Sequence, residues 1–470
     1  MGEEEGRDIS LLLGATGSLN RVLQVRPTRA RRELGNMLIT APTRGGKGLL
    51  AVSQLLTWRG SAVVNDIKGD LFEQTAGYRA TLGSVFVIDP RGRGHRYDPL
   101  TCRKTEDALH SSATQLLYDP NEGEGAVFTN RAIRMLTQIF KAAILEGANP
   151  IPYAAEMMNR GLHDAVIRLQ AVSLKAQLHP DQNLATKFLD SKFEEADFSD
   201  RFLRSAWSTL TSKLYPIITE TVIRSVSASD FTPSDLMCAD KPVTVYLRWP
   251  ELHLLALTPL IRLVWSSIID ELSNTYDTMK DKSQCRPVLM LIDEATRTPI
   301  PGLPEYTTTV AGRGITLWIA IQSLSQLDAV YGTKRAETLR DNTDNQIFYR
   351  PANLGTANHL EERLGQYSAW AHSQTTHAGT QTSEGQQERS IPLLTAWQIQ
   401  RMADEDIIGF HRALPPFRAK RMDWRNFPHL IRRTKIQPPQ LPHLPELQSL
   451  LSEPVGEITL PETLDFDEFN

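Results

Sequence analysis

An apolar run, a glycine-rich turn and a helical pattern follow one another directly over residues 37–57. The apolar run, residues 37–41, has the length of a buried strand, and the apolar residues after the turn recur at helical spacing. Two further short apolar runs, 61–66 and 85–90, follow with a helical stretch between them. Strands that alternate with helices form parallel sheets covered by helices on both faces. The sequence therefore predicts an α/β fold with a mostly parallel sheet.

The strand–helix alternation stops near residue 100 and resumes with apolar runs at 243–247, 288–292 and 315–321. Between these two regions lie several helical patterns and no convincing strand. One α/β domain interrupted by an all-α insertion explains this order better than three domains in series. The predicted boundaries are 1–103 and 236–433 for the two parts of the α/β domain, 104–235 for the insertion, and 434–470 for a Pro-rich acidic tail, expected to be disordered.

Composition excludes several classes of protein. The 470-residue chain is 41% hydrophobic with a net charge of −4, which is ordinary for a globular protein and unlike a uniformly basic nucleic-acid binder. Its three cysteines lie far apart, so neither a disulfide scaffold nor a zinc ribbon is expected. No run of 18 apolar residues and no signal peptide is present, which predicts a soluble chain. Residues 371–389, rich in Ser, Thr and Gln, are expected to form an exposed loop; His372 and His377 within it lack the neighbours of a metal site.

The turn at residues 41–48, between the first strand and its helix, has the composition of a phosphate-binding P-loop. Successive backbone N–H groups and a helix N-terminus can hold phosphates there, and Lys47 would reach the β- and γ-phosphates. Ala41 replaces the first glycine of GxxxxGK[ST], and Gly48 replaces the magnesium-binding hydroxyl. A glycine-rich turn without a ligand is the alternative. The predicted nucleotide-binding residues, with ATP as the cofactor, are Pro42, Thr43, Arg44, Gly45, Gly46, Lys47 and Gly48.

Polar residues follow two later strands in positions that suit a nucleotide site. Asp293 and Glu294 directly follow the strand at 288–292 and are placed to bind Mg²⁺ and to polarise an attacking water, respectively. Gln322 follows the strand at 315–321, where RecA-like motors keep a sensor of the γ-phosphate. Arg313, on a glycine-flanked turn, is either an arginine finger for a neighbouring subunit or a solvated surface charge.

Several of these segments, in order, resemble the type IV coupling proteins, the conjugative DNA-transfer ATPases of type IV secretion systems. That family commonly has glycine after the P-loop lysine, in agreement with Gly48. Asp70 and Asp98 stand where the family usually has Glu and Asn, and the usual N-terminal transmembrane helices are missing from this chain. The resemblance extends over about residues 35–425. Its segments are the P-loop, 66–71 with 75–79, 97–100, 291–295, 321–332, and 392–395 with 414–420.

The resemblance implies a RecA-like P-loop NTPase that assembles as a hexameric ring with ATP and Mg²⁺ at its subunit interfaces. It implies DNA with its relaxase or relaxosome, or protein effectors, as cargo, and components of the type IV secretion channel as partners. The expected location is the cytoplasm at the inner face of the bacterial cell membrane. Membrane contact would be indirect or through a missing N-terminal region.

Two other functions stay open on the sequence alone. One is a DNA translocase outside secretion, which needs the same phosphate site. The other is a docking receptor with weak ATPase activity or none, which the absence of a P-loop Ser/Thr allows. Two basic segments, from Arg21 to Arg32 and from Arg412 to Lys435, are either DNA contacts or solvated faces.

Overall fold

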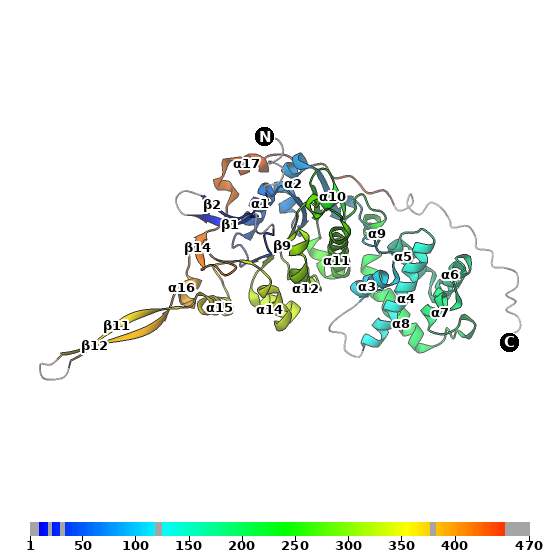
Figure 1. Cartoon of the computed structure of the whole chain (residues 1–470). Coiled ribbons are helices and arrows are strands. Elements are labelled where there is room, and N and C mark those ends of the chain that lie inside the picture. The colour runs from blue at the N-terminus through cyan, green and yellow to red at the C-terminus, as the bar shows by residue number, and fades with distance from the viewer. Residues whose placement is uncertain (1–8, 17–20, 29–32, 118–124, 377–381, 447–470) are drawn as a thin grey trace.

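A twelve-stranded mixed sheet runs through the body of the protein in the computed structural model, which describes residues 9–16, 21–28, 33–117, 125–376 and 382–446 (Figure 1). Its order is β2-β1-β14-β13-β10-β3-β9-β8-β4-β7-β5-β6, and the central strands from β10 to β5 are mutually parallel. The strands are β1 (Leu11–Thr16), β2 (Arg21–Val25), β3 (Met37–Thr40), β4 (Ser61–Asn65), β5 (Ser84–Asp89), β6 (Arg93–Gly94), β7 (Val243–Leu247), β8 (Val288–Ile292), β9 (Ile315–Ile321), β10 (Asn345–Tyr349), β13 (Asp406–His411) and β14 (Phe417–Lys420).

Both faces of the central strands are buried, because alternate residues enter two different hydrophobic clusters. In β8, Met290 packs with one cluster, while Leu289 and Leu291 pack with the other. A strand covered on both faces favours apolar residues at most positions, which explains the largely apolar runs in the sequence. The helices α1 (Lys47–Thr57) and α2 (Asp70–Leu82) cover one face, and α11 (Leu254–Thr278) covers the other.

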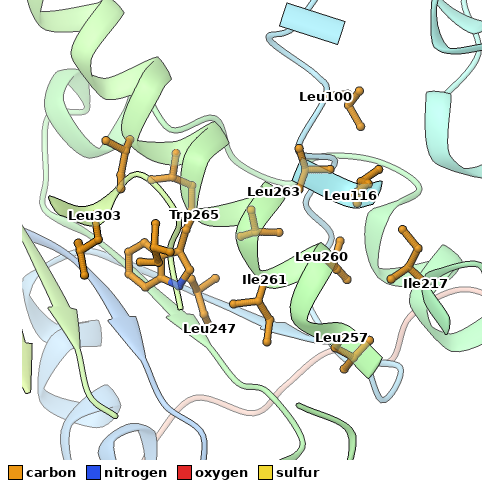
Figure 2. Packing of buried hydrophobic residues seen from close by; sticks show 14 of the residues in the cluster. Leu100, Leu116, Ile217, Leu247, Leu257, Leu260, Ile261, Leu263, Trp265 and Leu303 are labelled. Carbon is orange, nitrogen blue, oxygen red and sulfur yellow. The ribbon is translucent and has the colours of Figure 1, made fainter. Parts of the chain in front are cut away.

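The helix α11 joins the sheet to a separate group of helices formed by the insertion (Figures 1 and 2). Leu257, Leu260 and Ile261 lie between Leu247 of β7 and Ile217 of the insertion (Figure 2). The segment 251–278 is long and apolar enough to cross a membrane by length and composition alone, but 61% of its most apolar window is buried inside the protein. The insertion comprises α3 (Glu106–Leu117), α4 (Ala126–Leu145), α5 (Pro150–Arg160), α6 (Leu162–Lys175), α7 (Leu184–Leu189), α8 (Arg201–Leu214) and α9 (Glu220–Val226).

The remaining helices lie before, between or after the later strands, and α17 follows β14. They are α10 (Asp235–Cys238), α12 (Leu303–Thr309), α13 (Leu324–Tyr331), α14 (Thr333–Asp341), α15 (Leu354–Leu364), α16 (Ala396–Gln400) and α17 (Pro428–Thr434).

Two parts of the sheet structure differ from the sequence-based expectation. The predicted loop at 371–389 is wrong, because most of it belongs to a long antiparallel hairpin of β11 (Gln366–Thr376) and β12 (Thr382–Pro392) that projects from the body (Figure 1). Such a hairpin is held by backbone hydrogen bonds and needs no apolar face, so a Ser- and Gln-rich composition did not reveal it. Six strands of the large sheet were also not predicted: β1, β2, β6, β10, β13 and β14. Of these, β1 and β2 extend the sheet on the side of β14.

The segment resembling a family motif at residues 66–79 shapes the helix α2 and its surroundings. The carboxylate of Asp66 accepts hydrogen bonds from the backbone N–H groups of Gly69 and Phe72, both at 2.8 Å, and so caps the start of α2. A Cβ added to Gly77 would lie 2.0 Å from the carbonyl oxygen of Ile436. Glycine at this position therefore lets the C-terminal segment pass directly over α2.

That C-terminal segment, residues 436–446, crosses from α2 to the helical insertion. The N–H of Gly94 donates to the carbonyl of Pro442 at 2.8 Å, and the side chain of Arg224 in α9 donates to the carbonyl of Pro445 at 2.6 Å. The sequence predicts that this segment is part of a disordered tail, 434–470. Its described residues are instead hydrogen-bonded to the α/β domain at Gly94 and to the helical insertion at Arg224. Residues 447–470 lie outside the described residues.

Arg79 is buried, and no carboxylate of the described residues pairs with it. Its Nε donates to Thr244 at 2.8 Å, and its two terminal nitrogens donate to the carbonyls of Trp58 and Gly60. Burial lowers its pKa to about 10. The guanidinium thus ties α2 to the loop before β4 and to β7.

We expect Arg79→Met to lower the free energy of unfolding by about 3 kcal/mol, since it leaves two carbonyls and a hydroxyl without donors inside the protein. Urea denaturation monitored by tryptophan fluorescence measures this loss. Arg204→Met, on an exposed position of α8, is the control and should change stability by less than about 0.5 kcal/mol. Equal stability of the two variants would contradict the role assigned to Arg79.

Candidate nucleotide site

The parallel strands β3, β4, β8 and β9 all end at one edge of the sheet, here called the carboxyl edge. Ligands of open α/β sheets bind at this edge, because the loops that leave the strands converge there. The predicted P-loop follows β3, the acidic pair follows β8, and Gln322 follows β9. The fold therefore places three distant sequence motifs side by side.

The P-loop forms a tight turn between β3 and α1. It begins at Ala41, whose N–H donates to the carbonyl of Ile321 at 3.0 Å, and it is closed by the N–H of Gly45, which donates to the carbonyl of Pro42 at 2.9 Å. Gly46 has a φ of +98°, which favours glycine. The helix α1 starts at the next residue, so its free N–H groups face the turn.

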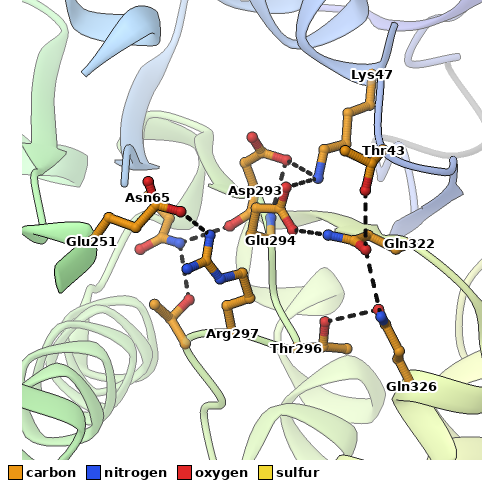
Figure 3. Close-up of polar contacts among 11 residues, drawn as sticks. Thr43, Lys47, Asn65, Glu251, Asp293, Glu294, Thr296, Arg297, Gln322 and Gln326 are labelled. Carbon is orange, nitrogen blue, oxygen red and sulfur yellow. Dashed lines mark hydrogen bonds and ion pairs between the residues drawn. The ribbon is translucent and has the colours of Figure 1, made fainter. Parts of the chain in front are cut away.

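Lys47 reaches across the carboxyl edge and forms ion pairs with both predicted acids. Its Nζ lies 2.5 Å from Glu294 Oε1 and 3.2 Å from Asp293 Oδ1 (Figure 3). The side chains of Lys47 and Glu294 are largely buried, at 12% and 8% exposure. The two carboxylates thus hold the ammonium group of Lys47 at the carboxyl edge.

The two carboxylates differ in their proton affinity. Burial raises the pKa of Asp293 above its ordinary value, although Lys47 opposes this rise. Burial also acts on Glu294, but the bonds from Lys47 and Gln322 outweigh it and hold the pKa of Glu294 below its ordinary value. Glu294 therefore stays ionised at neutral pH.

Gln322 connects the P-loop to Glu294. Its Nε2 donates to Glu294 Oε2 at 2.9 Å, and its Oε1 accepts from the hydroxyl of Thr43 at 3.3 Å (Figure 3). Glu294 itself has a φ of +55°, a conformation rare for residues with a side chain and costly unless the surroundings hold it. The polar contacts of Lys47 and Gln322 supply that support.

Asn65 and Trp249 belong to the same region and were missed by the sequence analysis. The amide of Asn65 donates to the carbonyl of Asp293 at 2.7 Å, and Trp249 Nε1 donates to Asn65 Oδ1 at 3.1 Å. A buried asparagine at the carboxyl end of β4 was the available signal for this position. These contacts fix the backbone that carries the acidic pair.

Arg313 does not join the cluster. It lies in the 3-10 turn η8 (Ala311–Arg313) before β9, at the opposite edge of the sheet. The seven residues of β9 separate it from Gln322 by about 20 Å. Its guanidinium pairs with Asp277 at 2.8 Å, and its side chain is 30% exposed. A role in a neighbouring subunit's site stays a prediction.

The residues present fit a nucleotide with a divalent cation. The loop amides and Lys47 suit phosphates, and Asp293 supplies an oxygen ligand of the kind Mg²⁺ prefers. Gly48 offers no hydroxyl, although a Cβ built there meets nothing within 4 Å. A serine side chain would therefore fit at position 48, but glycine supplies no hydroxyl oxygen for Mg²⁺.

A separate hollow of about 310 Å³ lies between α15 and the base of the hairpin, lined by Asn358, Glu361, Glu362, Gln366 and Pro392.

Much of the second basic segment is engaged within the protein. Lys420 and Arg425 pair with Asp406 and Asp423 at 2.7 and 2.6 Å. The guanidinium carbon of Arg433 lies over the ring of Tyr78, 4.5 Å from the ring centroid. These contacts leave less charge free for DNA than the sequence suggested. In the first segment, Arg29, Arg31 and Arg32 lie outside the described residues.

Comparison with known proteins gives one consistent family. Residues 20–442 match the family model described as type IV secretory system conjugative DNA transfer. The chain is 26% identical over 458 residues to the VirD4 protein of Rhizobium radiobacter, covering 93% of this chain and 64% of the relative. It is 28% identical over 399 residues to a conjugal transfer protein TraG of Escherichia coli, covering 78% and 61%. It therefore spans less than two thirds of the length of these relatives.

Solved structures with the same fold include the bacterial conjugative coupling protein TrwBΔN70 in complex with sulphate. It has a TM-score of 0.64 and 17% identity, and the match covers 87% of this chain and 93% of that one. TrwB in complex with ADP and Mg²⁺ gives a TM-score of 0.60 at 16% identity, covering 87% of each chain. The likeness confirms a RecA-like P-loop NTPase fold with a mostly parallel sheet.

Proposed function

The chain belongs to the type IV secretory system conjugative DNA-transfer family, and on that premise we propose that it is an ATP-hydrolysing coupling protein. Such a protein recruits a DNA–relaxase complex or protein substrates to the secretion channel and helps to drive their transfer. The observation that carries the proposal is the contact of Lys47 with Asp293 and Glu294, which joins a P-loop to an acidic pair at the carboxyl edge. Coupling proteins VirD4 and TraG are its relatives over most of this chain.

In this proposal each residue of the cluster has a separate task. Lys47 and the amides of residues 42–48 hold the phosphates of ATP, and Asp293 holds Mg²⁺, which offsets the phosphate charge when bound. As the phosphates attract Lys47, the carboxylate of Glu294 becomes available to orient a water. Gln322 already bonds both Thr43 and Glu294, so it can report the state of the phosphate to the water-orienting residue. Positioning and charge stabilisation suffice, and no covalent intermediate is required.

We also propose assembly as a homo-hexamer with Arg313 completing a neighbour's site. Its exposure and its distance from the chain's own cluster allow action only across a subunit boundary. The ion pair with Asp277 would then have to be exchanged for a phosphate contact. DNA with relaxase, or effector proteins, are the proposed cargo, and channel components are the proposed partners. The proposed location is the inner face of the bacterial membrane.

The test is ATP hydrolysis by the purified chain across a range of protein concentrations, with single-stranded DNA, double-stranded DNA or none. Activity that rises with concentration and with DNA supports a DNA-transfer motor. Activity that depends on concentration but ignores DNA favours protein cargo. ATP binding without hydrolysis under every condition would overturn the motor and leave a docking receptor.

A further inference from the structure

Arg421 lies against the P-loop, although most of the chain separates the two in sequence. It directly follows β14, which ends at the carboxyl edge beside the start of β13. Its Nη1 donates to the carbonyl of Gly45 at 3.0 Å, and its backbone N–H donates to the carbonyl of Glu405 at 2.6 Å. The guanidinium is thus held between the loop and the neighbouring edge of the sheet.

The same guanidinium fills the space beside Gly46. A Cβ added to Gly46 would lie 2.7 Å from Nη1 of Arg421 and 3.2 Å from its Cζ. Gly46 has left-handed backbone geometry and immediately precedes Lys47. Arg421 therefore contacts the loop at the Gly45 carbonyl and beside Gly46, the glycine on which the turn into α1 depends.

In the described part of the chain, the cations next to Arg421 in sequence or on the adjoining loop have carboxylate partners, but Arg421 does not. Arg350 pairs with Asp404 at 2.8 Å, Lys420 with Glu405 at 3.1 Å, and Arg425 with Asp423 at 2.6 Å. Within the described residues, no carboxylate lies within 4.0 Å of the Arg421 guanidinium. Its positive charge is therefore not neutralised by a direct ion pair, and the hydrogen bonds of its side chain go to backbone carbonyls.

We propose that Arg421 is a positioning residue of the P-loop that acts within its own subunit. By holding the Gly45 carbonyl outward, it keeps the loop amides turned toward the phosphates, and its charge adds to that of Lys47. This inference rests on the proposed nucleotide site. In the sequence, Arg421 is part of the basic segment from Arg412 to Lys435, for which DNA contact was one interpretation. Its contact with Gly45 instead assigns it to the P-loop.

The test compares Arg421→Ala, Arg421→Lys and the matched control Arg425→Ala for binding of fluorescent ATP and ADP analogues. Since the loop amides serve phosphates common to both nucleotides, Arg421→Ala should raise both Kd values by about tenfold or more, with the thermal midpoint within about 2 °C of the parent. Arg421→Lys keeps the charge and one donor, so it should recover part of the affinity. Arg425→Ala should bind like the parent.

Three results would overturn the inference. The first is an unchanged nucleotide affinity in Arg421→Ala. The second is a loss of affinity for ATP but not for ADP, which indicates direct contact with the γ-phosphate. The third is a folded Arg421→Lys that binds nucleotides no better than Arg421→Ala. If Arg421→Ala does not fold, the decision rests on Arg421→Lys. Weaker binding of both ATP and ADP than in the parent supports the inference. Affinity equal to that of the parent, or weaker binding of ATP only, overturns it. A parent protein that binds no ATP would instead refute the proposed nucleotide site itself.

Discussion

Lys47→Ala is expected to reduce ATP hydrolysis by more than 100-fold and to weaken ATP binding by at least tenfold. The substitution removes the cation that we propose contacts the β- and γ-phosphates. It also leaves Asp293 and Glu294 facing the phosphates with no positive charge between them. Repulsion between carboxylates and phosphates therefore adds to the lost attraction.

Steady-state hydrolysis and equilibrium binding of a fluorescent ATP analogue measure these two effects. Lys192→Ala, on a 75% exposed side chain of the insertion, is the matched control and should behave as the parent protein. Hydrolysis that survives in Lys47→Ala would show that a contaminating enzyme or another site produces the activity.

The same variant gives a second readout through pH. In the parent, Lys47 holds the Glu294 pKa below its ordinary value of 4.5, so the pair stabilises the fold above that pH and loses its effect as the pH falls further. We expect Lys47→Ala to be less stable than the parent at pH 7 by about 2 kcal/mol in urea denaturation, and the difference to shrink only as the pH falls below the ordinary Glu294 value of 4.5. A difference that stays constant as the pH falls well below this value would contradict the buried ion pair.

Glu294→Gln is expected to lower kcat by about 100- to 1,000-fold while the Kd for ATP changes by less than about threefold. Glutamine has nearly the shape of glutamate and can keep a hydrogen bond to Gln322, so the strained backbone at this position retains its support. It cannot accept a proton from water or stabilise positive charge as a carboxylate does. The loss should therefore appear in the chemical step and not in binding.

Glu251→Gln is the control for this second prediction. Glu251 pairs with Arg297 at 2.6 Å beside the same region, but its side chain is 50% exposed and does not touch Lys47 (Figure 3). Single-turnover hydrolysis separates chemistry from product release in both variants. A fall in ATP affinity with an unchanged chemical step would assign Glu294 to binding alone.

Six of the seven central strands were predictable because they are buried on both faces and appear as largely apolar runs between helices, whereas β10, which begins with Asn345 and Gln346, was missed. The candidate P-loop, Asp293 and Gln322 were singled out because each directly follows such a run. Arg421 was not, since its position depends on antiparallel strands added late in the chain, and β14 carries no distinctive apolar pattern. The hairpin of β11 and β12 was missed for a similar reason, because backbone pairing alone defines it.

The strand order also determines when the sheet can form during protein synthesis. Ile39 of β3 pairs with Ala320 of β9, and Val63 of β4 pairs with Met290 of β8. A ribosome adding about 5–20 residues per second needs tens of seconds to make the intervening chain. The helices of the insertion contact mainly one another and can fold within that interval, whereas the apolar strands made before them still lack partners. The yield of folded protein should therefore depend on chaperones that shield β3 and β4 until β8 and β9 emerge.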